Sequence, residues 1–427
     1  MRLPLTEIGL GDINRKRTGS PFYDNECNGR AETVGRLVAG VDDPRGISEL
    51  SESTAIQPRR SSSSLPIGLL GMLALVAVVE LILAGRRLDF TTVWADDWRR
   101  TAEAASNQAR GRDVLCFGDS LIKFGVLPRV IESKTGLTSF NLAVSAGPMP
   151  AEYFLFRRSL EAGARPKAVV ADFFALMLPD RPRGSIRNYP ELASLGDCVD
   201  LARNAADGDL LTSILLGKAL PSVRCRFEIR ASITGAFEGR RASPWPASQR
   251  IWKTWKQQLG AQPMPKPPGL PTSNPALVAD LTPDRWACDP INADYFDRFM
   301  ALAGSNQVPV FWVMPPLSAE IESGRVAKGT AAAYTRFARD ALARFPNLVV
   351  LDARGAGYDE SVHIDPIHLS DVGASVLTGD IAGAIVDHLD GRTSPRWLDL
   401  PPYAGRSGFE TVAPEVAVGR PSSSPAH

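Results

Sequence analysis

Short, continuously apolar runs alternate with helix-patterned segments from about residue 111 to residue 390. A strand that is apolar along its whole length must be covered on both faces, which is typical of parallel sheets. Parallel neighbours also need long crossovers, which the intervening helices supply. We therefore expect an α/β protein with a parallel sheet between two helical layers (α/β/α). The strands are expected at 113–117, 139–144, 167–174, 308–314 and 348–352, and the helices at 128–134, 152–162, 331–344 and 370–389.

The alternating pattern is one part of a longer chain. Residues 1–64 are polar and lack periodicity, which predicts a disordered tail or an over-extended start of translation. Residues 86–110 are expected to form a juxtamembrane linker or helix, and residues 391–427 a disordered tail rich in Pro and Ser. Regular alternation lapses between about 180 and 300, which predicts a helical insertion within a domain at 111–390.

Residues 65–85 form an apolar stretch with a single charge, Glu80. At about 1.5 Å per residue a helix of this length measures about 30 Å, enough to cross a bilayer once. A buried core helix is the alternative, whereas a cleaved signal peptide is disfavoured because the stretch begins far from Met1. Basic residues flank both ends in similar number, so their distribution does not set the orientation.

The residues that carry chemistry lie beside the expected strands. Gly118-Asp119-Ser120 follows the apolar run 114–117, where a strand-to-helix turn can expose a serine hydroxyl next to backbone N–H groups. Asp365 and His368 share one loop before the last helix and can supply an orienting carboxylate and a base. Because reactive groups gather at the carboxyl ends of parallel strands, we expect all three side chains at one edge.

Other roles for these residues remain open. Asp365 can instead cap the terminal helix, although Ser370 is better placed as its N-cap. His363 is a second candidate for the base, and His388, late in the final helix, is expected to be structural.

The two blocks 118–120 and 365–373 resemble those of the SGNH (GDSL-type) hydrolases, and the resemblance covers roughly residues 111–390. It is closer to membrane-anchored relatives that acylate cell-envelope polymers than to small secreted lipases. The resemblance implies a flavodoxin-like sheet, with Ser120 as nucleophile, His368 as general base and Asp365 as its partner.

The oxyanion hole is where the chain departs from this family. The family offers a glycine after the second strand, and here Gly147 is displaced by one position, so that the N–H of Ala146 can serve if its φ stays negative. The Ser120 N–H is a further candidate donor. The family's asparagine after the third strand is missing, and Asn188 is a possible substitute. Losing one donor typically costs about 10²–10³ in rate.

Composition excludes several other classes. A net charge of +1 without a basic stripe gives no case for a nucleic-acid partner. Five cysteines and four histidines show no metal-ligand spacing, so neither a metal nor an organic cofactor is expected. Cys198 and Cys225 can pair in an oxidising compartment. Tryptophans and arginines of the insertion can contact a sugar or an anion, or pack in the core and face solvent; these are Trp245, Trp252, Trp255, Trp286, Arg181, Arg183 and Arg187.

Together these features predict a single-pass membrane protein with an extracytoplasmic serine esterase or O-acyltransferase domain. By resemblance, its expected substrates are acyl esters of a carbohydrate or envelope polymer, and its expected partners belong to an envelope acylation complex. Two other functions stay open: a catalytically inactive SGNH-like scaffold in an acylation assembly, and a lipid esterase or thioesterase.

Overall fold

The computed structural model describes residues 67–85, 92–182, 187–237, 239, 245–273, 275–392, 395–403 and 406. The chain divides into two compact units, Met1–Gly85 and Arg86–His427, and each is described by itself. The sequence-based predictions for residues 1–64 lie outside the described residues.

The described part of the first unit is the helix α1, Ile67–Gly85. All but two of its side chains are exposed, although nearly all are apolar. Its 19 residues give a length of about 29 Å, close to the thickness of a bilayer core. Within the described residues, one other helix, α17 (Asp371–Leu389), is long and apolar enough to cross a membrane. Half of α17 is buried inside the second unit, so we assign it to the core.

The second unit is built on a six-stranded parallel sheet with the order β2-β1-β3-β4-β5-β6. The first five strands follow the 2-1-3-4-5 order of flavodoxin-like folds. β1 to β5 are buried on both faces almost throughout, which explains the continuously apolar sequences of β1, β3 and β4. The strands are β1 (Val114–Phe117), β2 (Ser139–Asn141), β3 (Ala168–Ala171), β4 (Val310–Met314), β5 (Leu348–Asp352) and β6 (Trp397–Asp399).

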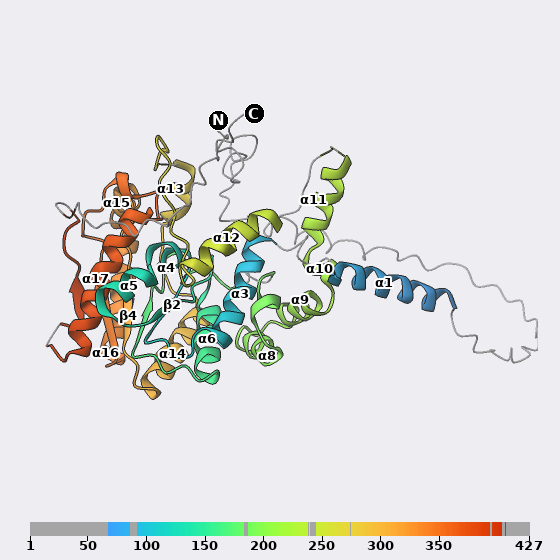
Figure 1. The fold of residues 1–427 in the computed structure, drawn as a ribbon, viewed down its shortest axis with the longest axis horizontal. Helices are drawn as coiled ribbons and strands as arrows, with labels where there is room; N and C mark the ends of the chain where they lie inside the picture. Colours follow the sequence, from blue (N-terminus) through green and yellow to red (C-terminus); the bar gives the residue numbers. More distant parts are fainter. Residues whose placement is uncertain are drawn as a thin grey trace, which may run out of the picture. The chain divides into compact units, whose positions relative to one another are not determined.

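Helices cover both faces of this sheet, so the α/β/α layering expected from the sequence is present. On one face, Val114 and Cys116 join a core with α4 (Ser120–Gly125), α5 (Pro128–Thr135) and α17. α5 and α17 lie side by side there (Figure 1). On the other face, Phe117 packs 5.3 Å from Phe156 and 5.9 Å from Phe299, measured between ring centroids. That face is covered by α6 (Met149–Glu161), α14 (Pro290–Ser305) and α16 (Thr330–Arg344).

The remaining helices lie outside these two layers or connect them. Most of them belong to the predicted insertion, and α11 stands out from the body of the unit (Figure 1). They are α3 (Val93–Asn107), α7 (Tyr189–Leu192), α8 (Leu195–Asn204), α9 (Gly208–Ala219), α10 (Pro221–Arg224), α11 (Arg226–Phe237), α12 (Trp245–Gln257), α13 (Pro275–Leu281), α15 (Ala319–Ala327) and the 3-10 turn η3 (Glu360–Val362).

Three boundaries differ from the sequence-based prediction. Residues 391–427 were expected to be a disordered tail, but 397–399 form β6, which pairs with β5 and extends the sheet. The predicted insertion at about 180–300 ends too late, because α14 is the core helix that leads from β3 into β4. Residues 86–110 were expected to be a linker or helix beside the membrane; α3 is helical, but its Trp98 and Ala105 are fully buried, so α3 belongs to the globular unit.

Candidate active site

The turn after β1 places Ser120 at the start of a helix. Gly118 has φ 139°, a conformation that favours glycine, and a Cβ atom there would lie 2.2 Å from the Oδ1 atom of Asp172. Asp119 then caps α4, since its side chain accepts a hydrogen bond from the Leu121 N–H at 2.7 Å. Ser120 is therefore the first residue of α4, just past the carboxyl end of β1.

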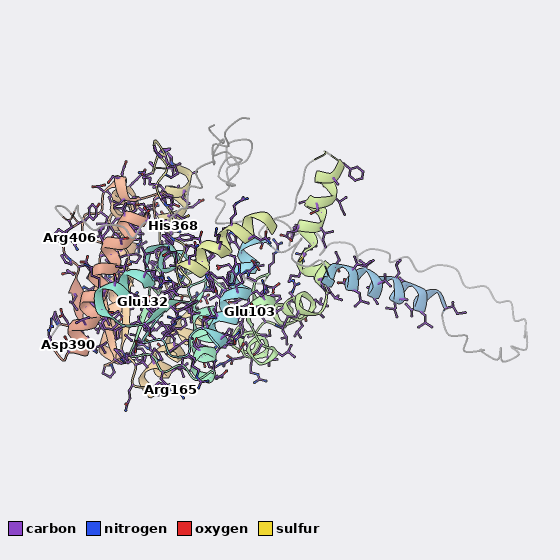
Figure 2. The ribbon with its side chains drawn as sticks, viewed as in Figure 1. Glu103, Glu132, Arg165, His368, Asp390 and Arg406 are labelled. Carbon is purple, nitrogen blue, oxygen red and sulfur yellow. The ribbon has the colours of Figure 1, made fainter. Side chains whose placement is uncertain are left out.

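Ser120, His368 and Asp365 form one hydrogen-bonded chain. The Nε2 atom of His368 lies 2.8 Å from Ser120 Oγ, and its Nδ1 atom lies 2.6 Å from Asp365 Oδ2. Both distances are those of good hydrogen bonds. With the Nδ1 proton donated to the carboxylate, Nε2 is left to accept the serine proton. Figure 2 shows His368 close to α4, the helix that begins with Ser120.

Asp365 is held as an ionised orienter of the imidazole. Its Oδ1 atom accepts hydrogen bonds from the backbone N–H groups of Ile367 at 2.9 Å and His368 at 2.8 Å. Burial alone would raise the pKa of Asp365, but the His368 imidazole and these N–H donors outweigh burial and lower it. The capping role goes to Ser370, whose side chain accepts from Gly373 at the start of α17.

Packing restricts the imidazole further. His368 is 1% exposed, and the ring of Phe124 meets it edge-on with 5.2 Å between the ring centroids. Ser120 itself is 7% exposed, so its hydroxyl lies in a largely desolvated environment. A hydrogen bond gains strength there relative to water.

The other two described histidines do not join this group. His363 is fully buried, its Nδ1 atom lies 3.0 Å from the Asp359 carbonyl oxygen, and burial lowers its pKa. Within the described residues no contact joins His363 to Ser120, so the structure does not support His363 as the base. His388 meets the ring of Phe311 edge-on at 5.5 Å, as expected for a structural residue.

The loop after β2 lies against the turn that carries the serine. The N–H groups of Leu142 and Val144 donate to the carbonyls of Cys116 and Gly118, which keeps the loop beside β1. A Cβ atom at Gly147 would lie 2.6 Å from Val144 Cγ2 and 3.1 Å from the Gly118 carbonyl oxygen, so this close approach requires glycine.

Two expectations about oxyanion donors in this loop are wrong. The Gly147 N–H donates to the Val144 carbonyl at 3.0 Å and is engaged within the turn. The Ala146 N–H was considered as a donor on the condition that φ stays negative, and this condition is not met, because φ of Ala146 is 51°. The Ser120 N–H is better placed: as the first N–H of α4 it has no intrahelical partner, and no described residue accepts from it.

Asn188, the asparagine considered from the sequence, does not reach the triad, and neither does Asn141 at the end of β2. Asn188 precedes α7 and makes no capping hydrogen bond, and within the described residues no hydrogen bond joins it to Ser120 or His368. Asn141 is fully buried, and its amide donates to the carbonyls of Ile122 and Val126 at 2.9 Å each. Asn141 therefore fixes the end of α4, and its buried side chain is not accessible to a substrate.

Behind the serine turn, two buried carboxyl groups that the sequence analysis missed, Asp172 and Glu152, lie near the buried Asp119. Asp172 follows β3 directly, and its Oδ1 atom accepts from the Asp119 N–H at 3.4 Å. Burial, followed by the charges of Asp119 and Glu152, raises the pKa of Asp172 well above its usual value. Burial also raises the pKa of Glu152 and of Asp119. The position of Asp172, directly after a strand at the reactive edge, is the signal that could have found it.

Side chains of the insertion mostly pack within the protein. Trp252 and Trp255 stack with 4.4 Å between ring centroids, and Trp286 donates to the Ala175 carbonyl at 2.5 Å. Arg181 donates to the carbonyl of Ala205, and Arg187 pairs with Glu228. Cys198 and Cys225 are free thiols, so the disulfide considered from the sequence is absent. The side chains of Trp245 and Arg183 lie outside the described residues.

Comparison with known proteins adds no relative. The chain matches no family model, and no curated protein matches it.

Within the described residues, no group of three or more His, Cys, Asp or Glu side chains is arranged to hold a metal ion.

Proposed function

We propose that the protein is a membrane-anchored serine esterase or O-acyltransferase of the SGNH type, with Ser120 as nucleophile. The observation that carries this proposal is the continuous chain of hydrogen bonds from Asp365 through His368 to Ser120. A serine hydroxyl is a weak nucleophile near neutral pH and needs a base within hydrogen-bond reach, which His368 provides. The edge at which the triad meets is also the edge where parallel sheets carry their ligands.

The geometry supports a two-step acyl transfer. Ser120 Oγ attacks the ester carbonyl while His368 Nε2 takes the hydroxyl proton, and Asp365 stabilises the resulting imidazolium. The carbonyl electrons move to the oxygen, which the Ser120 N–H can stabilise. The tetrahedral species then expels the alcohol, which receives the proton from His368, and leaves an acyl-Ser120 ester. Water or an acceptor hydroxyl reverses these steps and releases the acyl group.

The substrate class rests on the resemblance and on the anchor. The exposed apolar helix α1 has the length of a single membrane crossing, and the resemblance favours an extracytoplasmic catalytic unit. We propose O-acyl esters of a carbohydrate or envelope polymer as substrates, and partners in an acylation complex. Acetylated sugars, acyl lipids and acyl thioesters, tested on the same preparation, separate this substrate class from a lipid esterase or thioesterase.

The direct test is covalent labelling of the full chain in detergent with a fluorophosphonate probe. We expect labelling of the wild type and its loss in both Ser120→Ala and His368→Ala. His388→Ala is the matched control, because this histidine lies near the end of α17, where its ring meets Phe311 edge-on, and is not part of the triad. A folded wild-type protein that takes up no probe would contradict the enzyme proposal and favour the inactive scaffold.

A further inference from the structure

The helix α3 hydrogen-bonds to both backbone polar groups of one residue, Ser145, in the loop after β2. The Ser145 N–H donates to Asp97 Oδ2 at 3.0 Å, and the Ser145 carbonyl accepts from Trp98 Nε1 at 3.0 Å. Asp97 and Trp98 are neighbours on α3, and Trp98 is fully buried with Tyr189 edge-on at 5.5 Å. The backbone N–H and carbonyl of Ser145 are thus both fixed by a helix that lies outside the sequence blocks of the triad.

Asp97 also connects this loop with the helix of the nucleophile. Its Oδ1 atom lies 2.5 Å from the Nζ atom of Lys123, which is fully buried and sits one helical turn after Ser120 in α4. Lys123 also donates to the carbonyl of Ala143 at 2.8 Å. A buried ammonium group needs a counter-charge, so Asp97 and Lys123 fix each other's position. The Asp97 carboxylate therefore contacts both α4, through Lys123, and the loop after β2, through Ser145.

The residue after Ser145 needs such support. Ala146 has φ 51°, a conformation that costs free energy for a residue with a Cβ atom. A strained residue of this kind persists only where its surroundings over-determine it. The hold on Ser145 fixes the chain on one side, and the hydrogen bond from Gly147 to Val144 fixes it on the other.

We propose that Asp97 and Trp98 are positioning residues of the active site. They hold the turn Ser145–Gly147 against Gly118. The backbone of this turn, beside the reacting carbonyl, therefore keeps its position while the oxyanion forms. This proposal rests on the proposed function for its effect on rate, whereas the hold on the turn is independent of it. α3 begins eight residues after the end of α1, and among the described elements it is the one that follows α1 in the chain.

Two variants of the full chain test this proposal, with one matched control. Trp98→Phe keeps an aromatic ring at this buried position but removes the Nε1 donor together with the five-membered ring that carries it. Asp97→Ala with Lys123→Met removes the carboxylate without leaving a buried unpaired ammonium group. The control is Asp96→Asn: Asp96 is as buried as Asp97, but it pairs with Arg99 and Arg100 within α3.

The readouts are kcat and KM on an acyl ester, and amide hydrogen exchange at residues 145 and 146. We expect kcat to fall about 10-fold or more in Trp98→Phe and about 100-fold in the double variant, because a displacement of about 1 Å at the reacting centre can cost about 10²-fold in rate. KM should change by less than about 3-fold, since the turn acts on the transition state. Exchange at both amides should accelerate in these variants and not in the control.

The outcomes separate the two proposals. Wild-type kcat in both variants, or equal losses in the control, would overturn the positioning role. A wild-type protein that neither turns over esters nor takes up the probe would contradict the proposed function. The exchange rates would then decide alone: selective acceleration in Trp98→Phe and the double variant supports the hold on the turn, and unchanged rates refute it.

Discussion

His368 Nε2 lies 2.8 Å from Ser120 Oγ although 248 residues separate them in the chain. The parallel sheet explains this proximity, because β1 and β5 both deliver their following loops to the same edge. A short hydrogen bond between the two side chains is the arrangement that acyl transfer requires. Single substitutions can test the role of each residue around it.

Replacing Asp365 by Asn should lower kcat by about 10³–10⁴-fold with little change in folding. The amide oxygen is held by the backbone N–H groups of Ile367 and His368, so the NH₂ group faces Nδ1 and cannot accept its hydrogen bond, and the imidazole adopts the wrong tautomer or turns away from Ser120. Ester turnover and probe uptake measure this loss. Asp371→Asn is the control, since Asp371 lies in the first turn of α17 and bonds to Val372 instead of His368. Equal effects of the two substitutions would argue against an orienting role.

Replacing Gly118 by Ala should destabilise the protein by about 2–4 kcal/mol and abolish probe uptake. The residue has φ 139°, and its new methyl group would lie 2.2 Å from a carboxylate oxygen of Asp172. Gly136→Ala is the matched control: it also has positive φ, at 71°, but nothing lies within 4 Å of its Cβ position. The control should cost about 1–2 kcal/mol and keep activity. Urea unfolding and labelling distinguish the two, and similar losses in both would refute a steric demand at Gly118.

Deleting residues 67–85 should release the protein from membranes. A helix that exposes nearly all of its apolar side chains, as α1 does, is unfavourable in water and favourable in a bilayer. Val76→Arg, near the middle of α1, should weaken insertion, since a central arginine costs about 2.5–3.5 kcal/mol. Val76→Leu is the matched control. Alkaline extraction and flotation with lipid report the outcome, and a deleted chain that still floats would place the anchor elsewhere.

The strands and the triad could be read from the sequence because both depend on local patterns. The strand expected at 348–352 matches β5 residue for residue, and the expected turn brings Ser120 to the edge that receives His368. β6 was missed because a three-residue strand with half-exposed side chains gives no apolar run. The oxyanion loop could not be predicted either. The φ of Ala146 and the buried Asp97–Lys123 pair depend on contacts between distant segments, and charged residues in a sequence ordinarily indicate an exposed surface.

Replacing Asp172 by Asn should stabilise the protein at neutral pH and leave it unchanged in acid. Burial and the neighbouring carboxyl groups raise the folded-state pKa of Asp172 well above its ordinary value of 3.8. The folded state therefore holds a proton that the unfolded chain loses, and the stability of the wild type falls as the pH rises from about 4 towards the folded-state pKa.

An amide at position 172 carries no proton to lose, and its oxygen can still accept from the Asp119 N–H. The variant should therefore be more stable than the wild type at pH 7, and the difference should grow as the pH rises. Urea unfolding between pH 4 and pH 8 measures the difference. A difference that does not grow with pH would mean that the Asp172 carboxyl is ionised in the folded protein, and that another group neutralises the charge behind the serine turn.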